Sequence, residues 1–143
     1  MITTQENHSI VMALAGDNER LTFLPTYLGA LMMRGENLVC AWMRRLSDDY
    51  AGGHWDFCKL SNGGFYLVPG GPEWLHVEVH NNGFSGGVSA DAAGIIATLF
   101  MLGQLATETE GTDDGDSLIR HYDRLVTYAR AHAEARSILR AID

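Results

Sequence analysis

The segment 92–105 constrains the fold most, because its composition predicts a helix that is apolar on nearly every side. Such a helix is stable in water only when other elements cover it. Its longest run of apolar or small residues, 92–102, includes Gly94 and Thr98 and falls short of the roughly 20 apolar residues that a bilayer-spanning helix needs. We therefore expect a central helix that lies buried on a sheet, and no membrane span.

Strand-like segments lie ahead of this helix. They are aromatic and β-branched, and they occupy residues 54–61, 64–68, 74–80 and 84–88. Asn62 and Gly63 separate the first two and suit the positive backbone angles of a tight hairpin turn, while 81–83 forms a second turn signal. These patterns predict an antiparallel meander.

Helical patterns lie on both sides of these strands. Pro25 suits the first turn of a short helix that runs to about Arg34, and Gly35 suits the left-handed position that closes a helix. Apolar residues at helical spacing then predict three more helices, at 36–46, 118–129 and 135–142. Ala133 allows the last two of these to run together.

Together these segments predict an α+β protein. We expect a single domain over residues 1–143, in which an antiparallel meander of three to four strands packs with about four to five helices. The first part, residues 1–19, is expected to be a strand or a flexible arm, since the short apolar run at 9–14 is ambiguous by periodicity.

Charge and cysteine content limit the function. Eighteen acidic against ten basic residues give a net charge of -8, which repels phosphate backbones and argues against direct binding to nucleic acid. The N-terminal residues lack the basic start and apolar stretch of a secretory signal, and two cysteines are too few for a disulfide framework. We expect a cytoplasmic protein with reduced cysteines.

His76, Glu78 and His80 are the residues best spaced to bind a metal ion. Alternate residues of a strand point to the same side, so the three could form the site of a metal-dependent hydrolase. The opposite face of this strand is apolar, however, and a half-solvated strand shows the same pattern. We favour the solvated face and predict no metal, with the hydrolase as the alternative.

A second candidate is the connection 47–55, which carries two acids, large aromatic residues and paired glycines. Loops held by a rigid scaffold often bind partners, and this one offers Asp48, Asp49, Tyr50 and Trp55. The competing interpretation is structural: the acids cap a turn, and the aromatic side chains cover the core.

A third candidate is the acidic segment 108–116, with Asp113, Asp114 and Asp116. Such a segment could imitate DNA phosphates, as an acidic DNA-mimic inhibitor does. We favour a solvated connection whose acids stabilise the start of the next helix. No Ser/His/Asp or Cys/His arrangement stands out, so we predict neither catalytic residues nor a cofactor.

As a set, several blocks resemble the antirestriction protein family of the KlcA/ArdB type, in the same order and spacing over roughly residues 20 to 142. The blocks are Arg34-Gly35-Glu36 with Trp42-Met43-Arg44-Arg45-Leu46-Ser47, Asp49-Tyr50-Ala51-Gly52-Gly53-His54-Trp55-Asp56-Phe57, Leu60-Ser61-Asn62-Gly63-Gly64-Phe65-Tyr66, Asn82-Gly83-Phe84 with Ser89-Ala90-Asp91-Ala92-Ala93-Gly94-Ile95, and Leu102-Gly103-Gln104-Leu105.

The resemblance implies a plasmid- or island-borne protein that relieves type I restriction of incoming unmodified DNA. It implies no enzyme activity and no cofactor. The implied partner is the type I restriction-modification enzyme or an associated host protein, and the resemblance does not assign contact residues.

Overall fold

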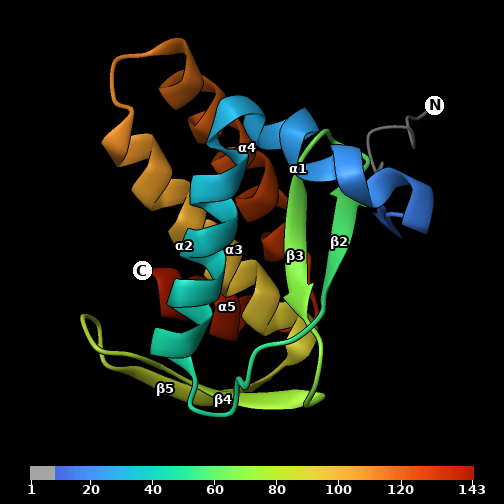
Figure 1. Ribbon diagram of the computed structural model, residues 1–143. Helices are drawn as coiled ribbons and strands as arrows, with labels where there is room; N and C mark the ends of the chain where they lie inside the picture. Colours follow the sequence, from blue (N-terminus) through green and yellow to red (C-terminus); the bar gives the residue numbers. More distant parts are fainter. Residues whose placement is uncertain (1–8) are drawn as a thin grey trace, which may run out of the picture.

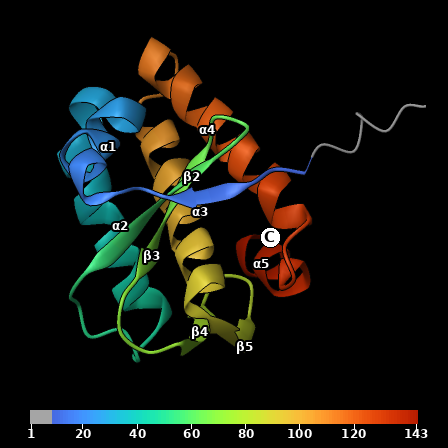
Figure 2. The same cartoon turned by 90° about the vertical axis from the view of Figure 1, so that its right-hand side faces the viewer.

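The helix α3 (Ala90–Glu108) lies at the centre of the molecule, as its composition predicts. The computed structural model describes residues 9–143. In Figure 2, α3 runs behind β2 and β3, with α2 on one side of it and α4 on the other. By length and composition alone α3 is able to cross a membrane, so the sequence analysis was wrong to find its apolar run too short for a membrane span. In this fold protein atoms cover it, and 61% of its apolar window is buried.

The α+β class is confirmed, with helices and strands in alternating blocks (Figure 1). The helices are α1 (Arg20–Leu28), α2 (Met32–Leu46), α3, α4 (Asp113–Arg130) and α5 (Ala135–Ile142), with 3-10 turns at Asp17–Glu19 and Gly29–Leu31. The strands are β1 (Met12–Leu14), β2 (Trp55–Leu60), β3 (Phe65–Pro69), β4 (Trp74–Val79) and β5 (Phe84–Ser89). The strand alternative for 9–14 is thus confirmed in part, whereas residues 1–8 of the expected arm lie outside the described residues.

The strands divide into two antiparallel sheets, β1-β2-β3 and β4-β5, rather than one continuous meander. The cause lies at the edge of β3, where the Leu67 amide donates a hydrogen bond to Thr98 Oγ1 of α3 at 3.1 Å. Gly94 lies so close to this edge that a Cβ there would be 2.1 Å from the Leu67 carbonyl oxygen. Because α3 occupies the edge that the next strand would use, β4 pairs with β5 in a separate hairpin.

The predicted helix from Pro25 to Arg34 is wrong at both ends. Pro25 lies inside α1, which begins at Arg20 and is closed by Gly29, with φ 55°. Gly35 lies inside α2, where a Cβ would be 2.5 Å from Leu28 Cδ1. Glycine therefore serves close helix packing at 35 and helix termination at 29, and the local sequence does not distinguish these two uses.

The last two helices do not run together, although Ala133 permits it. A turn separates α4 from α5 because its side chains bind the start of α3. His132 Nε2 lies 2.8 Å from Asp91 Oδ2, and the Glu134 carboxylate accepts the Ser89 amide at 2.9 Å. These contacts fix the C-terminal helices on the central helix.

His121 of α4 is buried against aromatic rings. It packs edge-on against Tyr27 and Phe65, with ring centroids 5.6 and 5.5 Å away. Its Nδ1 has no hydrogen-bond partner among residues 9–143. Burial lowers the pKa of His121, and the nearby charges of Arg124 and Arg120 lower it further. The fold therefore favours the neutral imidazole.

We expect Gly94→Ala to lower the free energy of unfolding by roughly 3 kcal/mol, since the added Cβ meets backbone that cannot move aside easily. Gly103→Ala in the same helix is the matched control. Its Cβ would meet Tyr122 Cε2 at 3.7 Å, an ordinary contact, so it should be neutral or stabilising by up to roughly 1 kcal/mol. Urea unfolding checks both, and a Gly94→Ala variant as stable as the wild type would contradict the close approach.

His121 should make stability depend on pH. Its folded-state pKa is lowered, so its contribution is complete above the unfolded pKa of about 6.5 and is lost as pH falls toward the folded pKa. His121→Phe keeps a ring in the aromatic site and removes the titration. We expect the melting temperature of the variant to fall less than that of the wild type between about pH 8 and about pH 5. Equal falls would show that His121 does not contribute.

Candidate functional site

Cavities open on two faces of α2. On one face a cavity of about 420 Å³, the Arg44 cavity, is lined by Arg20, Glu36, Asn37, Val39, Cys40, Arg44, Gly53, His54, Trp55, Phe57 and Leu67. On the other face lie two neighbouring cavities that share Arg45, Leu46, Glu78 and His80. These two form the more continuous surface, which we describe from its residues upward.

The first of the pair, the β4-edge cavity, has a volume of about 300 Å³. It is lined by Arg45, Leu46, Asp48, Asp49, His76, Glu78 and His80. Two groups that the sequence singled out separately, the acids after α2 and the His/Glu/His face of β4, therefore meet around Arg45. In Figure 1 the C-terminal end of α2 comes down onto β4, which brings these segments together.

Asp49 ties the connection after α2 to β4. Its Oδ2 accepts the backbone amide of His76 at 2.8 Å, while its own amide donates to Ser47 Oγ at 3.2 Å. The neighbouring Asp48 is exposed and has no side-chain hydrogen bond within the described part of the chain. Asp49 therefore positions the loop, and Asp48 presents a free carboxylate.

The His76, Glu78 and His80 side chains point to the solvent side of β4, opposite the buried Leu75 and Val77. His76 Nε2 lies 3.5 Å from a Glu78 carboxylate oxygen and 3.0 Å from the Oγ of Ser85, the β5 residue paired with Glu78. Over residues 9–143, no three His, Cys, Asp or Glu side chains are placed to share a metal ion. The arrangement is that of a solvated strand face.

Tyr50 and Trp55 turn into the protein, and each residue keeps 8% of its surface exposed. Trp55 Nε1 donates to the Tyr50 hydroxyl at 2.9 Å, and burial raises the pKa of Tyr50. These two aromatic residues cover the core, as the structural interpretation held, and Trp55 also lines the Arg44 cavity. A partner-contact role stays a prediction, better suited to Asp48 and Asp49.

Asp113, Asp114 and Asp116 lie in the first turn of α4. Thr112 caps this helix, its Oγ1 accepting the Gly115 amide at 3.0 Å. Acidic side chains in the first turn stabilise a helix because they interact favourably with the positive end of its dipole. The start of α4 lies at the top of Figure 1 and β4 at the bottom, so these acids belong to a different surface from Asp48 and Asp49.

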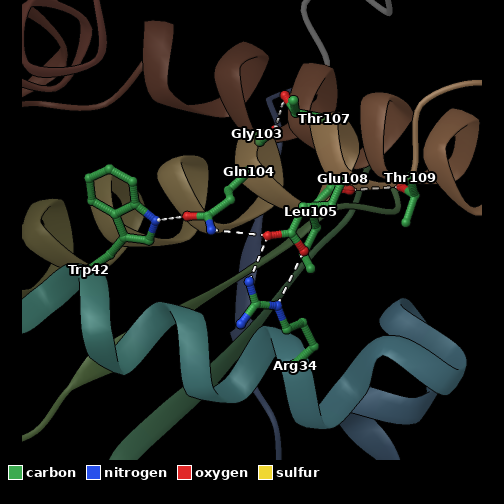
Figure 3. Close-up of polar contacts among 8 residues, drawn as sticks. All are labelled: Arg34, Trp42, Gly103, Gln104, Leu105, Thr107, Glu108 and Thr109. Atoms are coloured by element: carbon green, nitrogen blue, oxygen red, sulfur yellow. Dashed lines mark hydrogen bonds and ion pairs between the residues drawn. The ribbon is translucent and has the colours of Figure 1, made fainter.

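A chain of polar contacts that sequence reasoning missed joins α2 to α3 (Figure 3). Trp42 Nε1 donates to Gln104 Oε1 at 2.9 Å, and the Gln104 amide donates to Glu108 at 3.1 Å. Arg34 binds the same carboxylate through two nitrogens, at 2.6 and 3.2 Å, and lowers the pKa of Glu108. The residues are spread over 74 positions, and the sequence signal was that three of them fall in the family-like blocks.

Trp42 is held on both sides. Its ring stacks on Phe100 with centroids 4.5 Å apart and planes 13° apart, while Arg45 Cζ lies 4.5 Å from the indole centroid. These three side chains line the second cavity of the pair, the Trp42 cavity, of about 190 Å³. Tryptophan and arginine side chains at a concave surface are typical of energetically important protein contacts.

Comparisons with known proteins identify relatives over the whole chain. A family model described as antirestriction protein matches residues 48–143. An antirestriction protein KlcA of Escherichia coli is 54% identical, over 96% of this chain and 98% of the relative. A second KlcA of the same species is 51% identical over 100% of both chains. The uncharacterized protein YafX of E. coli strain K12 is 36% identical over 99% of this chain and 100% of its own.

The fold also matches a solved structure. The two chains superpose with a TM-score of 0.89 and 53% identity, over 100% of each. That work describes the KlcA and ArdB proteins as having a novel fold, with antirestriction activity against type I DNA restriction systems in vivo but not in vitro.

We expect Asp49→Ala to cost about 1 kcal/mol of folding free energy, because the His76 amide loses its acceptor. Amide hydrogen exchange at His76 should become faster in this variant. Asp48→Ala is the matched control, since it removes the same group one residue earlier, and it should leave both quantities unchanged. Unaltered exchange at His76 in Asp49→Ala would show that the contact does not hold the loop in solution.

Proposed function

Because the chain belongs to the antirestriction protein family, we propose that it relieves type I restriction of unmodified DNA that enters a bacterial cell. The observation that carries this proposal is the match over the whole chain. Sequence identity of 54% and a TM-score of 0.89 span the fold, the α2 surface and the β4–β5 hairpin together.

We further propose that the protein acts by binding another protein and not by catalysis. The Trp42 and β4-edge cavities present aromatic, arginine and carboxylate groups together, which suits protein recognition. The net charge of -8 disfavours direct contact with DNA. The partner in this proposal is the type I restriction-modification enzyme or a host protein associated with it, met in the cytoplasm.

The solved relatives act in vivo but not in vitro. For this chain we infer an analogous requirement for a cellular component that a purified reaction lacks. An associated host protein is the simplest such component, and its presence would make binding to the purified restriction enzyme alone insufficient.

The test is the plating efficiency of an unmodified phage on a host with a type I restriction system, with and without this protein. We expect plating to rise when the protein is expressed, and the effect to vanish in an isogenic host without the restriction genes. Undiminished restriction in cells that contain the soluble, folded protein would overturn the proposal.

A cleavage assay with purified type I enzyme then tests whether a further host component is required. We expect the purified protein alone to leave cleavage unchanged and to inhibit it once extract of the restricting host is added. Full inhibition without extract would show that the restriction enzyme itself is the partner.

A further inference from the structure

The outer edge of β4 is an unpaired strand edge. Among residues 9–143, β4 pairs with β5 alone. His76 stands opposite Gly87, yet its amide points away from β5 and donates to Asp49 Oδ2. On the far side of the hairpin the Ser89 amide likewise points outward, to Glu134. These two contacts establish which backbone groups face outward along both strands.

Glu78 therefore directs its amide and carbonyl to the same outer edge as His76, because backbone direction repeats every second residue. Outside the β4–β5 pairing, the Glu78 backbone has no hydrogen-bond partner among residues 9–143. The β4-edge cavity runs beside these groups. Because β4 ends at Val79, the edge from His76 onward spans four strand residues, or about 13 Å. The His76 amide in this stretch is bound to Asp49, so a partner segment would bond to Glu78.

The charges around this edge select the partner. Asp48, Asp49 and Glu78 line the cavity against one arginine, Arg45, whose guanidinium lies over Trp42. A basic side chain is the complement of this excess of carboxylates. A second copy of the chain would bring the same acids to the same edge, and the like charges would repel.

We propose that the outer edge of β4 takes up an extended segment of a protein partner that carries a basic side chain, by β-strand addition. The inference rests on the proposed function, since the partner is the protein through which restriction is relieved. The segment's backbone bonds to the Glu78 amide and carbonyl, its basic side chain meets Asp48 and Glu78, and a neighbouring side chain reaches the Trp42 cavity.

Glu78→Pro tests both contacts proposed for Glu78, because proline removes the outward amide and the carboxylate without removing a bond to β5, and an edge strand tolerates it. Gly87→Pro is the matched control. It removes an outward amide from the opposite edge of the same hairpin, at a position where an added Cβ meets nothing within 4 Å. Both variants are compared with wild type by urea unfolding and at equal cellular amounts by phage plating.

We expect the rise in phage plating to be at least about tenfold smaller with Glu78→Pro than with wild type. Gly87→Pro should raise plating as much as wild type does. A folded Glu78→Pro variant with full activity would overturn the proposal. Failure of wild type to relieve restriction is a different outcome, which overturns the proposed function. A wild-type dimer that Glu78→Pro converts to a monomer in sedimentation would assign the edge to a second copy and overturn the choice of partner.

If Glu78→Pro does not fold, Asp48→Arg tests the proposed partner contact at the outer edge of β4. It reverses the charge of an exposed side chain beside the edge and should reduce relief by at least about tenfold. Asp123→Arg makes the same change on the exposed face of α4 and should have no effect. Full activity of folded Asp48→Arg would overturn the proposal.

Discussion

The contact between α3 and the edge of β3 determines the arrangement of everything else. Gly94 lets the helix backbone touch the Leu67 carbonyl, and Thr98 Oγ1 accepts the hydrogen bond that the Leu67 amide would otherwise donate to a neighbouring strand. A buried strand edge must have its polar groups satisfied, and here a helix does so. The first sheet therefore ends at β3, and within residues 9–143 the strands of the β4–β5 hairpin pair only with each other.

The position of α2 follows from the same central helix. Gly35 lets α2 approach Leu28, and the chain of contacts from Trp42 through Gln104 to Glu108 and Arg34 fastens α2 along α3. With α2 fixed, its C-terminal end presents Trp42 and Arg45 beside β4. Asp49 then joins the connection after α2 to β4 by accepting the His76 amide. The surface proposed to bind a partner thus depends on packing between three elements. Contacts inside the protein hold Trp42, Arg45 and Asp49, whereas the exposed Asp48 carboxylate has no hydrogen bond among residues 9–143.

Much of the fold followed from local patterns. The all-apolar composition of α3 required a central position, and the Asn62-Gly63 turn and the alternation of Leu75, Val77 and Val79 located strands to within a residue or two. The errors in the bounds of α1 and α2 fell at glycine and proline, because one residue type has several structural roles: Gly35 packs helices and does not close one. The site was harder, because Asp48, Asp49 and the His76 face could be named singly, yet their meeting around Arg45 could not.

The sequence by itself determined the α+β class, the buried central helix, the net charge that disfavours DNA contact, and the family to which the chain belongs. These are properties of composition and local periodicity, or of residue order along the chain. Tertiary structure alone decided that the strands form two sheets, that Tyr50 and Trp55 face inward, and that β4 pairs with no strand other than β5 among residues 9–143. Such features arise from contacts between residues far apart in sequence, and local propensity carries no information about which distant surfaces will meet.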